Sequence, residues 1–195
     1  EEARFVDEKL IELKESGRQI KSEQIVVAAG SRPFIPPIDG VEDTKFWVST
    51  DALNPDYRPE SIIMVGGGYI SMELAHFYDA MGTEVTILER GDRLLKREDR
   101  DISEKITGLA EERYNVELGL SASKILERDG RKVVKAEKDG QEVEFEADEI
   151  LMAAGRVPNS DTLEVENAGI ETAERGFIHT DSEMETSVDG VYALG

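Results

Sequence analysis

The chain has 195 residues, enough for one large domain or two small ones. It carries 43 Asp plus Glu against 23 Lys plus Arg, a formal net charge of −20, so its surface repels nucleic acid and anionic membranes and we expect neither as a partner. The absence of cysteine excludes a disulfide, a thiolate nucleophile and a cysteine-bound metal within these residues.

No targeting or membrane-spanning segment is visible in the sequence. No apolar run approaches the roughly 18 residues that span a bilayer, and the charged opening "EEARFVDEKL" lacks the apolar core of a signal peptide. We therefore expect a cytoplasmic protein. The acidity has two interpretations: ordinary solubility, or adaptation to high salt, in which dissolved ions screen the repulsion between the acids.

The N-terminal part predicts strands followed by a proline-rich crossing. "ARFV", "LIELK" and "GRQIK" indicate a hairpin with Gly17 near a turn, and "QIVVAAG" indicates a buried strand that ends at Gly30. "SRPFIPPIDG" contains three prolines, so it cannot form a helix or a central strand. We expect a domain boundary near residues 40–45, followed by a short crossing segment in which Ser49 or Thr50 caps a brief turn.

The central part predicts alternating strands and helices. "SIIMV" (61–65) is a continuous apolar run typical of a parallel strand covered on both faces; "EVTIL" (84–88) and "NVELGL" are two further strands. A helix should run from Tyr69 to Met81, with Gly82 as its C′ residue, and a second over 97–114. Helical spacing predicts two buried stripes: Ile70, Leu74, Phe77 and Met81 in the first helix, and Ile102, Ile106 and Leu109 in the second. The order strand, helix, strand, helix, strand indicates an α/β fold with a Rossmann-like doubly wound parallel sheet.

A β-meander follows the third strand. "SASKILE", "KVVKAEK" and "EVEFEA" are strands separated by Asp129-Gly130 and Asp139-Gly140, both favourable hairpin turns. "EILMAAG" followed by "RVPN" echoes the earlier "QIVVAAG" followed by "SRPF", which fits two related units. The end of the chain predicts one strand around "GFIHT" and another at "VYALG".

The turn after the first central strand matches most of a dinucleotide-binding fingerprint. Gly66 and Gly68 fill the first two glycine places, and Gly67 between them adds backbone freedom. Amides around Tyr69 and Ile70, at the start of the helix, should face a pyrophosphate, where the helix dipole also favours negative charge.

Ser71 stands where the fingerprint expects a third glycine. Its small side chain permits close packing, and its hydroxyl needs a partner such as a backbone carbonyl one turn back.

Glu89 lies 21 residues after Gly68, where the acid that binds the adenosine ribose is expected. A carboxylate there repels a 2′-phosphate, so the sequence favours NAD over NADP. Arg90, Arg93 and Lys96 follow at once and either hold such a phosphate or are solvated charges paired with neighbouring acids.

Four segments together resemble the flavin-dependent pyridine nucleotide–disulfide oxidoreductases, most closely dihydrolipoamide dehydrogenase. They are "VVAAGSRPFIPPIDG", "VGGGYISMELA", "MAAGRVPN" and "SVDGVYALG", in the order and spacing of that family. The resemblance implies that residues 45–160 form the NAD(P)-binding domain, and that 1–44 and 161–195 are parts of an FAD-type dinucleotide-binding domain. It places the remaining FAD domain, a redox cysteine pair and a dimerisation domain outside this segment, in a full-length homodimer that binds FAD and a nicotinamide cofactor.

The resemblance also implies roles for single residues. Tyr69 matches the aromatic residue that covers the flavin and swings away when nicotinamide arrives, and Glu73 matches an acid near the nicotinamide carboxamide. Ala122 matches a small position beside the adenine. Two glycines and one arginine match positions beside the nicotinamide (Gly155) or on the flavin side (Gly30 and Arg156).

The expected function is hydride transfer between nicotinamide and FAD in a whole enzyme, with this segment binding NAD(H) and catalysing nothing alone. His76 and His179 have no second ligand or nucleophile nearby in sequence, so we expect both to be structural and expect no metal site. Two alternatives stay open: an NADH oxidase or ferredoxin-reductase-type flavoenzyme without a cysteine pair, and a non-catalytic NAD-binding module.

Overall fold

The computed structural model describes residues 1–138 and 140–195. The chain forms two compact units, one made of residues 33–155 and the other of residues 1–32 and 156–195. The chain first passes from one unit to the other at residues 32–33, before the boundary that the sequence predicts near residue 44. The proline-rich segment is not a free linker, because Ile38 within it is buried in a core of the central unit.

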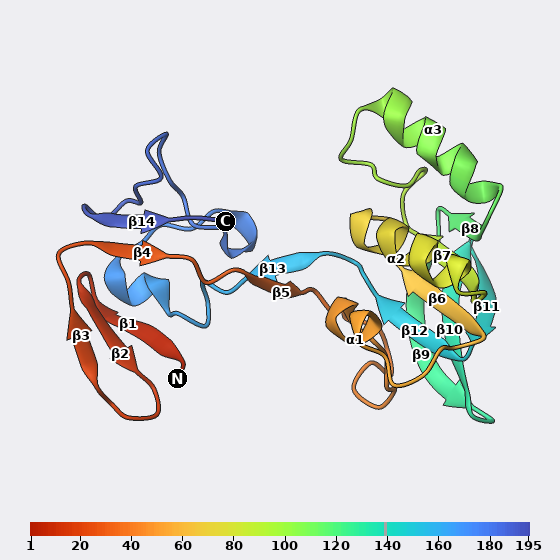
Figure 1. Ribbon diagram of the computed structural model, residues 1–195, viewed down its shortest axis with the longest axis horizontal. Helices are drawn as coiled ribbons and strands as arrows, with labels where there is room; N and C mark the ends of the chain where they lie inside the picture. Colours follow the sequence, from red (N-terminus) through yellow and green to blue (C-terminus); the bar gives the residue numbers. More distant parts are fainter. Residues whose placement is uncertain (139) are drawn as a thin grey trace. The chain divides into compact units, whose positions relative to one another are not determined.

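The central unit contains a parallel sheet with the strand order β12-β6-β7-β8 (Figure 1). The strands are β6 (Ser61–Val65), β7 (Glu84–Glu89), β8 (Asn115–Leu118) and β12 (Glu149–Met152). The first strand therefore lies between the second and the fourth, with the third outside the second. This is the strand order of a doubly wound mononucleotide-binding half, so the predicted fold class is confirmed.

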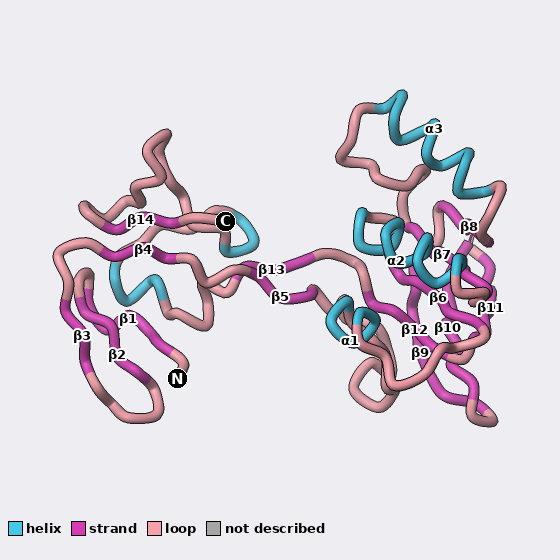
Figure 2. The backbone as a smooth tube through the Cα atoms, viewed as in Figure 1, coloured by secondary structure: helices cyan, strands magenta, loops and turns pink. Residues whose placement is uncertain are grey.

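The two faces of this sheet have different covers. Side chains of β6 alternate: Ile62 and Met64 pack in one core, and Ile63 and Val65 in the other. The first core also contains residues of α1 (Ser49–Leu53), α2 (Tyr69–Ala80) and α3 (Arg100–Glu111). The second contains residues of the meander, whose strands β9 (Ser121–Arg128), β10 (Arg131–Lys138) and β11 (Gln141–Ala147) are labelled in Figure 2.

The buried face of α2 differs from the predicted stripe. Leu74 is buried as expected, but Phe77 and Met81 are 46% and 47% exposed, while the sheet-facing residues are Ser71, Leu74, Ala75 and Tyr78. Tyr78 is fully buried, and its hydroxyl is satisfied there because it donates to the Ala52 carbonyl at 2.7 Å. The helix ends as predicted, with Gly82 at a φ of +83° directly after the cap residue Met81.

The buried face of α3 is also rotated relative to the prediction. Ile102 and Leu109 are 53% and 48% exposed, and the buried residues are Ser103, Thr107 and Ala110. Hydroxyl groups make this possible. Ser103 donates to the Leu94 carbonyl, and the Leu94 amide donates to Thr107 at 3.0 Å, so the polar atoms are satisfied within the core.

The sequence predicts Ser49 or Thr50 as the cap of α1, but neither residue caps this helix. The cap residue is Val48, whose amide donates to the Asp51 carboxylate at 2.9 Å, so Ser49 is already the first helical residue. An acid in the first turn therefore supplies the capping group.

The meander forms as predicted, with β10 paired antiparallel to β9 and β11. Asp129 and Gly130 both have positive φ, as a two-residue hairpin turn requires. The second predicted turn includes residue 139, which lies outside the described residues. Lys135 and Arg128 on β10 and β9 form ion pairs with acids on the outer strand β11: Glu142, Glu144 and Glu146.

The other unit has its own small core, which contains Phe5, Val27 and Val191. An antiparallel sheet of β1 (Ala3–Asp7), β2 (Leu10–Leu13) and β3 (Gln19–Lys21) confirms the predicted hairpin. The strand β4 (Ile25–Val27) pairs in parallel with β14 (Val191–Ala193), the predicted C-terminal strand. The strands β5 (Ser31–Pro33) and β13 (Arg156–Pro158) pair where the chain crosses between the units.

Two predictions for this unit are wrong. The strand from "QIVVAAG" is short, and Val26 at its centre is 60% exposed, so it is covered on one face rather than two. No strand forms around "GFIHT" within residues 140–195. The 3-10 helix η2 (Glu174–Gly176), which follows another 3-10 helix η1 (Val165–Ala168), ends at the first residue of that segment, and only an isolated bridge between Ile178 and Thr172 forms beyond it. The positive φ of Arg175 and Gly176 departs from the extended backbone of a strand. Among the described helices, none has the length and apolar character needed to span a bilayer.

Candidate functional site

The carboxyl ends of the four parallel strands meet at one edge of the central sheet, the usual ligand-binding edge of such folds. A turn follows each strand: Gly66–Gly68 after β6, Arg90–Gly91 after β7, Gly119 after β8 and Ala153–Gly155 after β12. The strand order reverses between β6 and β12, which makes the turn after β6 the topological switch point.

The three glycines after β6 have different surroundings. Gly66 has a φ of +112°, and a Cβ there would lie 2.5 Å from the Ala153 carbonyl oxygen. A Cβ on Gly67 would lie 2.6 Å from Leu94 Cδ2. By contrast, a Cβ on Gly68 would meet no described atom within 4 Å. The fold therefore requires glycine at position 66, and a side chain at position 67 would displace Leu94 or Glu89, whereas Gly68 leaves open space at the mouth of the turn.

Gly68 is also the N-cap residue of α2. The first hydrogen bond within this helix runs from the Met72 amide to the Gly68 carbonyl at 3.1 Å. The amides of Tyr69, Ile70 and Ser71 therefore have no acceptor within the helix. The twelve-residue helix adds a positive dipole at this end. Open space beside these donors is the arrangement that accepts a phosphate group.

Ser71 is fully buried, and its hydroxyl donates to the Gly66 carbonyl at 2.5 Å. The predicted backbone partner is therefore present. The serine packs as closely as the fold requires and closes the glycine turn by a hydrogen bond.

Glu89 is the last residue of β7 and is only 8% exposed. Its Oε2 accepts the Gly67 amide and its Oε1 accepts the Gly91 amide, each at 2.6 Å. The structure thus brings Glu89 to the glycine turn, with both carboxylate oxygens bound to backbone N–H groups.

Two residues of this edge were missed by the sequence reasoning. Gly91 donates to Glu89, and its carbonyl accepts the Gly119 amide at 2.9 Å. The signal for both was a glycine within two residues of a strand end, which marks a turn at the carboxyl edge.

Of the three basic residues after Glu89, the described ion pairs bring only Lys96 to its carboxylate. Arg90 is exposed, and Arg93 pairs with Asp92 at 2.9 Å, one of the solvated pairings considered from the sequence. Lys96 Nζ lies 3.9 Å from Glu89 Oε1. The Nε of Arg93 is buried and has no hydrogen-bond partner among the described residues.

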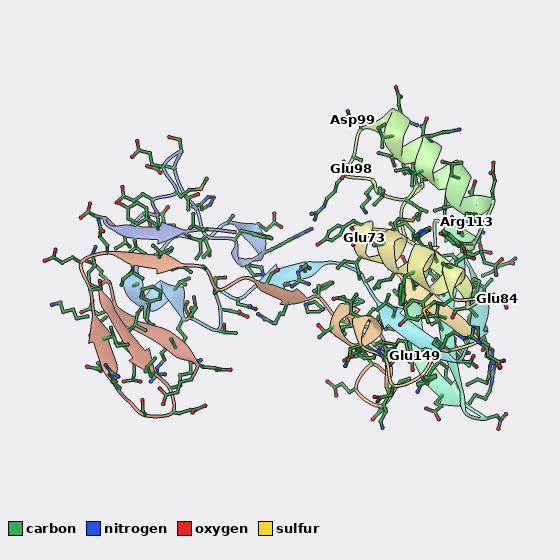
Figure 3. All side chains as sticks on the ribbon, in the orientation of Figure 1. Glu73, Glu84, Glu98, Asp99, Arg113 and Glu149 are labelled. Atoms are coloured by element: carbon green, nitrogen blue, oxygen red, sulfur yellow. The ribbon has the colours of Figure 1, made fainter. Side chains whose placement is uncertain are left out.

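Three further predicted site residues lie in the central unit. Tyr69 begins α2 and is 59% exposed, and Glu73 follows one turn later on an exposed face (Figure 3). Ala122, the second residue of β9, is partly buried against the core under the meander. Gly155 has a φ of +142°, and its carbonyl accepts the Phe34 amide at 2.9 Å.

Two predicted site residues lie in the other unit. Gly30 has a φ of +67°, and its carbonyl accepts the Asn159 amide at 3.0 Å. Arg156 donates from Nε to the Ser31 hydroxyl at 2.8 Å and also bonds to the Ser31 carbonyl, so it is not a free surface charge.

Both histidines are exposed. Within residues 1–138 and 140–195, no three His, Asp or Glu side chains are arranged to hold a metal ion.

The amino-terminal edge of the sheet carries a second polar cluster. Glu149, labelled in Figure 3, is the buried first residue of β12 and accepts the Tyr57 hydroxyl at 2.8 Å. Partial burial and this hydrogen bond raise the pKa of Tyr57 to about 12. The Trp47 ring lies 5.5 Å from the Tyr57 ring, centroid to centroid, which fixes the phenol beside the carboxylate.

Comparison with known proteins matches all of residues 1–195 to the family model of pyridine nucleotide-disulphide oxidoreductases. The chain therefore belongs to this family. It is 38% identical to a dihydrolipoyl dehydrogenase of Haloferax volcanii, covering 99% of this chain and 42% of the relative. It is 36% identical to a mercuric reductase of Staphylococcus aureus, covering 100% of this chain and 35% of the relative.

A similar solved structure is the HOCl-induced flavoprotein disulfide reductase RclA of Escherichia coli. Its TM-score is 0.87 at 31% sequence identity, over 99% of this chain and 44% of that chain. The chain thus spans less than half the length of these relatives. These findings confirm the predicted family and fold.

Proposed function

We propose that the central unit binds NAD(H) at the carboxyl edge of its parallel sheet, as part of a flavin-dependent disulfide oxidoreductase most like dihydrolipoyl dehydrogenase. The observation that carries this proposal is the open space at Gly68, directly beside the first amides of α2. A pyrophosphate in that space would accept hydrogen bonds from the Tyr69 and Ile70 amides and benefit from the helix dipole.

The chain's other residues have supporting tasks in this proposal. Gly66 keeps the turn against the Ala153 carbonyl, and Ser71 closes it from the helix side. Exposed Tyr69 covers the place of the nicotinamide or flavin ring, and Glu73 lies one turn away to bind the carboxamide. The bound cofactor supplies the hydride chemistry, and these residues orient it.

In the other unit, Gly30 and Arg156 belong to the FAD side of the proposed whole enzyme. The positive φ of Gly30 and the two bonds of Arg156 to Ser31 fix this turn. Family membership supports FAD as the second cofactor, a homodimeric whole protein and an electron route from flavin to a disulfide.

For the nicotinamide cofactor we propose NAD rather than NADP. The buried carboxylate of Glu89 repels a 2′-phosphate and leaves lone pairs for a ribose hydroxyl. Lys96 and the unpaired Nε of Arg93 are the observations that favour NADP, and the titration below includes both cofactors.

The test is titration of the 195-residue chain with NADH and NADPH, together with the variant Gly68→Ala. Because a Cβ at Gly68 meets no described atom and its φ is −85°, the variant should fold normally and lose at least about tenfold in NADH affinity, a loss of 1.4 kcal/mol. Gly108→Ala, on α3 and equally free of contacts, is the matched control and should bind like the parent chain.

Equal NADH affinity in Gly68→Ala and the parent chain would contradict the proposed phosphate position. Tighter binding of NADPH than NADH in the parent chain would contradict the choice of NAD. If neither nucleotide binds, the proposed site is wrong.

A further inference from the structure

From these contacts we infer that Glu89 is a positioning residue: its carboxylate holds the glycine turn and the turn after β7 in the shape that receives the pyrophosphate. This inference rests on the proposed nucleotide site and deepens it. It differs from ribose binding, because it makes the phosphate affinity depend on a side chain that does not touch the phosphate.

The geometry shows that Glu89 bridges two turns from separate strands. Oε2 accepts the Gly67 amide and Oε1 accepts the Gly91 amide, both at 2.6 Å, the short distance of charge-assisted bonds. Neither amide has another acceptor among the described residues. A shift of either turn would leave a donor unpaired, buried at Gly67 and partly buried at Gly91, which is unfavourable.

Further contacts extend this connection to a third turn and to the following loop. The Gly91 carbonyl accepts the Gly119 amide at 2.9 Å, after β8, and the Gly67 carbonyl accepts the Leu95 amide at 2.8 Å. Glu89 is thus at the centre of a set of bonds that links the turns after β6, β7 and β8.

The surroundings of Gly67 show that this arrangement is tight. A Cβ on Gly67 would lie 3.0 Å from both Cβ and Cγ of Glu89, so the backbone of the turn rests directly on the Glu89 side chain. Since Gly67 immediately precedes Gly68, fixing the Gly67 amide fixes the direction of the chain into the N-terminus of α2.

The positioning role and simple electrostatics predict opposite results when the charge is removed. Glu89→Gln takes away a negative charge near the anion site, and electrostatics alone would therefore tighten the binding of pyrophosphate. The positioning role predicts weaker binding, because a glutamine presents an NH₂ group to one of the two backbone N–H groups and releases that turn.

The experiment is a titration with inorganic pyrophosphate and with NAD⁺, in which amide chemical shifts report binding. It compares the parent chain, Glu89→Gln and the control Asp92→Asn. Asp92 is an exposed acid one residue after Gly91 whose side chain pairs with Arg93 and bonds to no backbone amide among the described residues, so its variant makes the same charge change while the Gly67 and Gly91 amides keep their acceptor. We expect Glu89→Gln to bind both ligands more weakly by a similar factor, about tenfold or more. Asp92→Asn should bind pyrophosphate with unchanged or higher affinity.

A second measurement needs no variant. In the ligand-free parent chain, the Gly67 and Gly91 amides should exchange with solvent slowly, although neither bonds to a backbone carbonyl. This result is readable even if Glu89→Gln fails to fold. Rapid exchange of both amides would overturn the inference.

Unchanged or tighter pyrophosphate binding by folded Glu89→Gln would also overturn it. Weaker NAD⁺ binding with unchanged pyrophosphate binding would assign Glu89 to the ribose alone, and the proposed function would stand. If the parent chain binds neither ligand, the proposed function itself fails.

Discussion

Serine at the third place of the glycine turn is tolerated because its one polar atom has a partner. The hydroxyl of fully buried Ser71 donates to the Gly66 carbonyl. The side chain that replaces the third glycine therefore stabilises the glycine turn by a hydrogen bond. The sequence predicted a backbone carbonyl as the partner. It also placed Glu89 at the correct end of β7, but the bonds from this side chain to Gly67 and Gly91 depend on how three turns meet in space.

Tyr57 allows a pH-dependent prediction at the scale of one residue. Its folded pKa, about 12, lies above the usual tyrosine value of 10.0, so its bond to Glu149 stabilises the fold fully below pH 10 and is lost as the pH rises from 10 to 12. We expect the difference in unfolding free energy between the parent chain and Tyr57→Phe to be constant below pH 10 and to shrink above it.

Urea unfolding of both proteins at several pH values measures this difference. The phenylalanine keeps the ring beside Trp47, so the variant isolates the hydroxyl. A difference that is still undiminished at pH 12 would contradict the assignment.

At the scale of elements, the sequence predicted every strand of the parallel sheet and the meander, and both long helices. It misjudged which helix faces are buried. Helical spacing predicts apolar residues on the buried stripe of α3, whereas Ser103 and Thr107 pack inward because Leu94, from a preceding loop, supplies their hydrogen-bond partners. A contact between a helix and a loop has no periodicity, so the sequence pattern could not reveal it.

The rotated face of α3 leads to a stability prediction. Thr107→Val keeps the shape of the side chain but leaves the Leu94 amide unpaired in the core, which should cost about 1–3 kcal/mol. Ile102→Thr, on the exposed face, is the control and should change stability by no more than about 0.5 kcal/mol. Chemical denaturation measures both, and a larger loss for Ile102→Thr would support the stripe expected from the sequence.

At the scale of the whole molecule, the net charge of −20 sets the response to salt. If the acidity is an adaptation to high salt, raising potassium chloride from about 0.1 to 1 M shortens the Debye length from about 10 to 3 Å and weakens the repulsion between acids. We expect the melting temperature to rise by at least a few degrees, about 1 kcal/mol or more.

Thermal unfolding over this range gives the result, with an uncharged solute at equal osmolality as the control for general solute exclusion. A melting temperature that does not rise with salt would favour the solubility interpretation. The chain's compact units, each with its own core, should both show the trend.

The row of acids on β11 has a consequence for aggregation. This strand is the outermost of the meander, and an outer strand offers unpaired backbone groups to other chains. Glu142, Glu144 and Glu146 are all exposed on it, and their ion pairs reach inward to β9 and β10. If the β11 strands of two copies approached each other, these like charges would repel. The exposed edge of the meander should therefore resist pairing with another copy, even in a crowded solution.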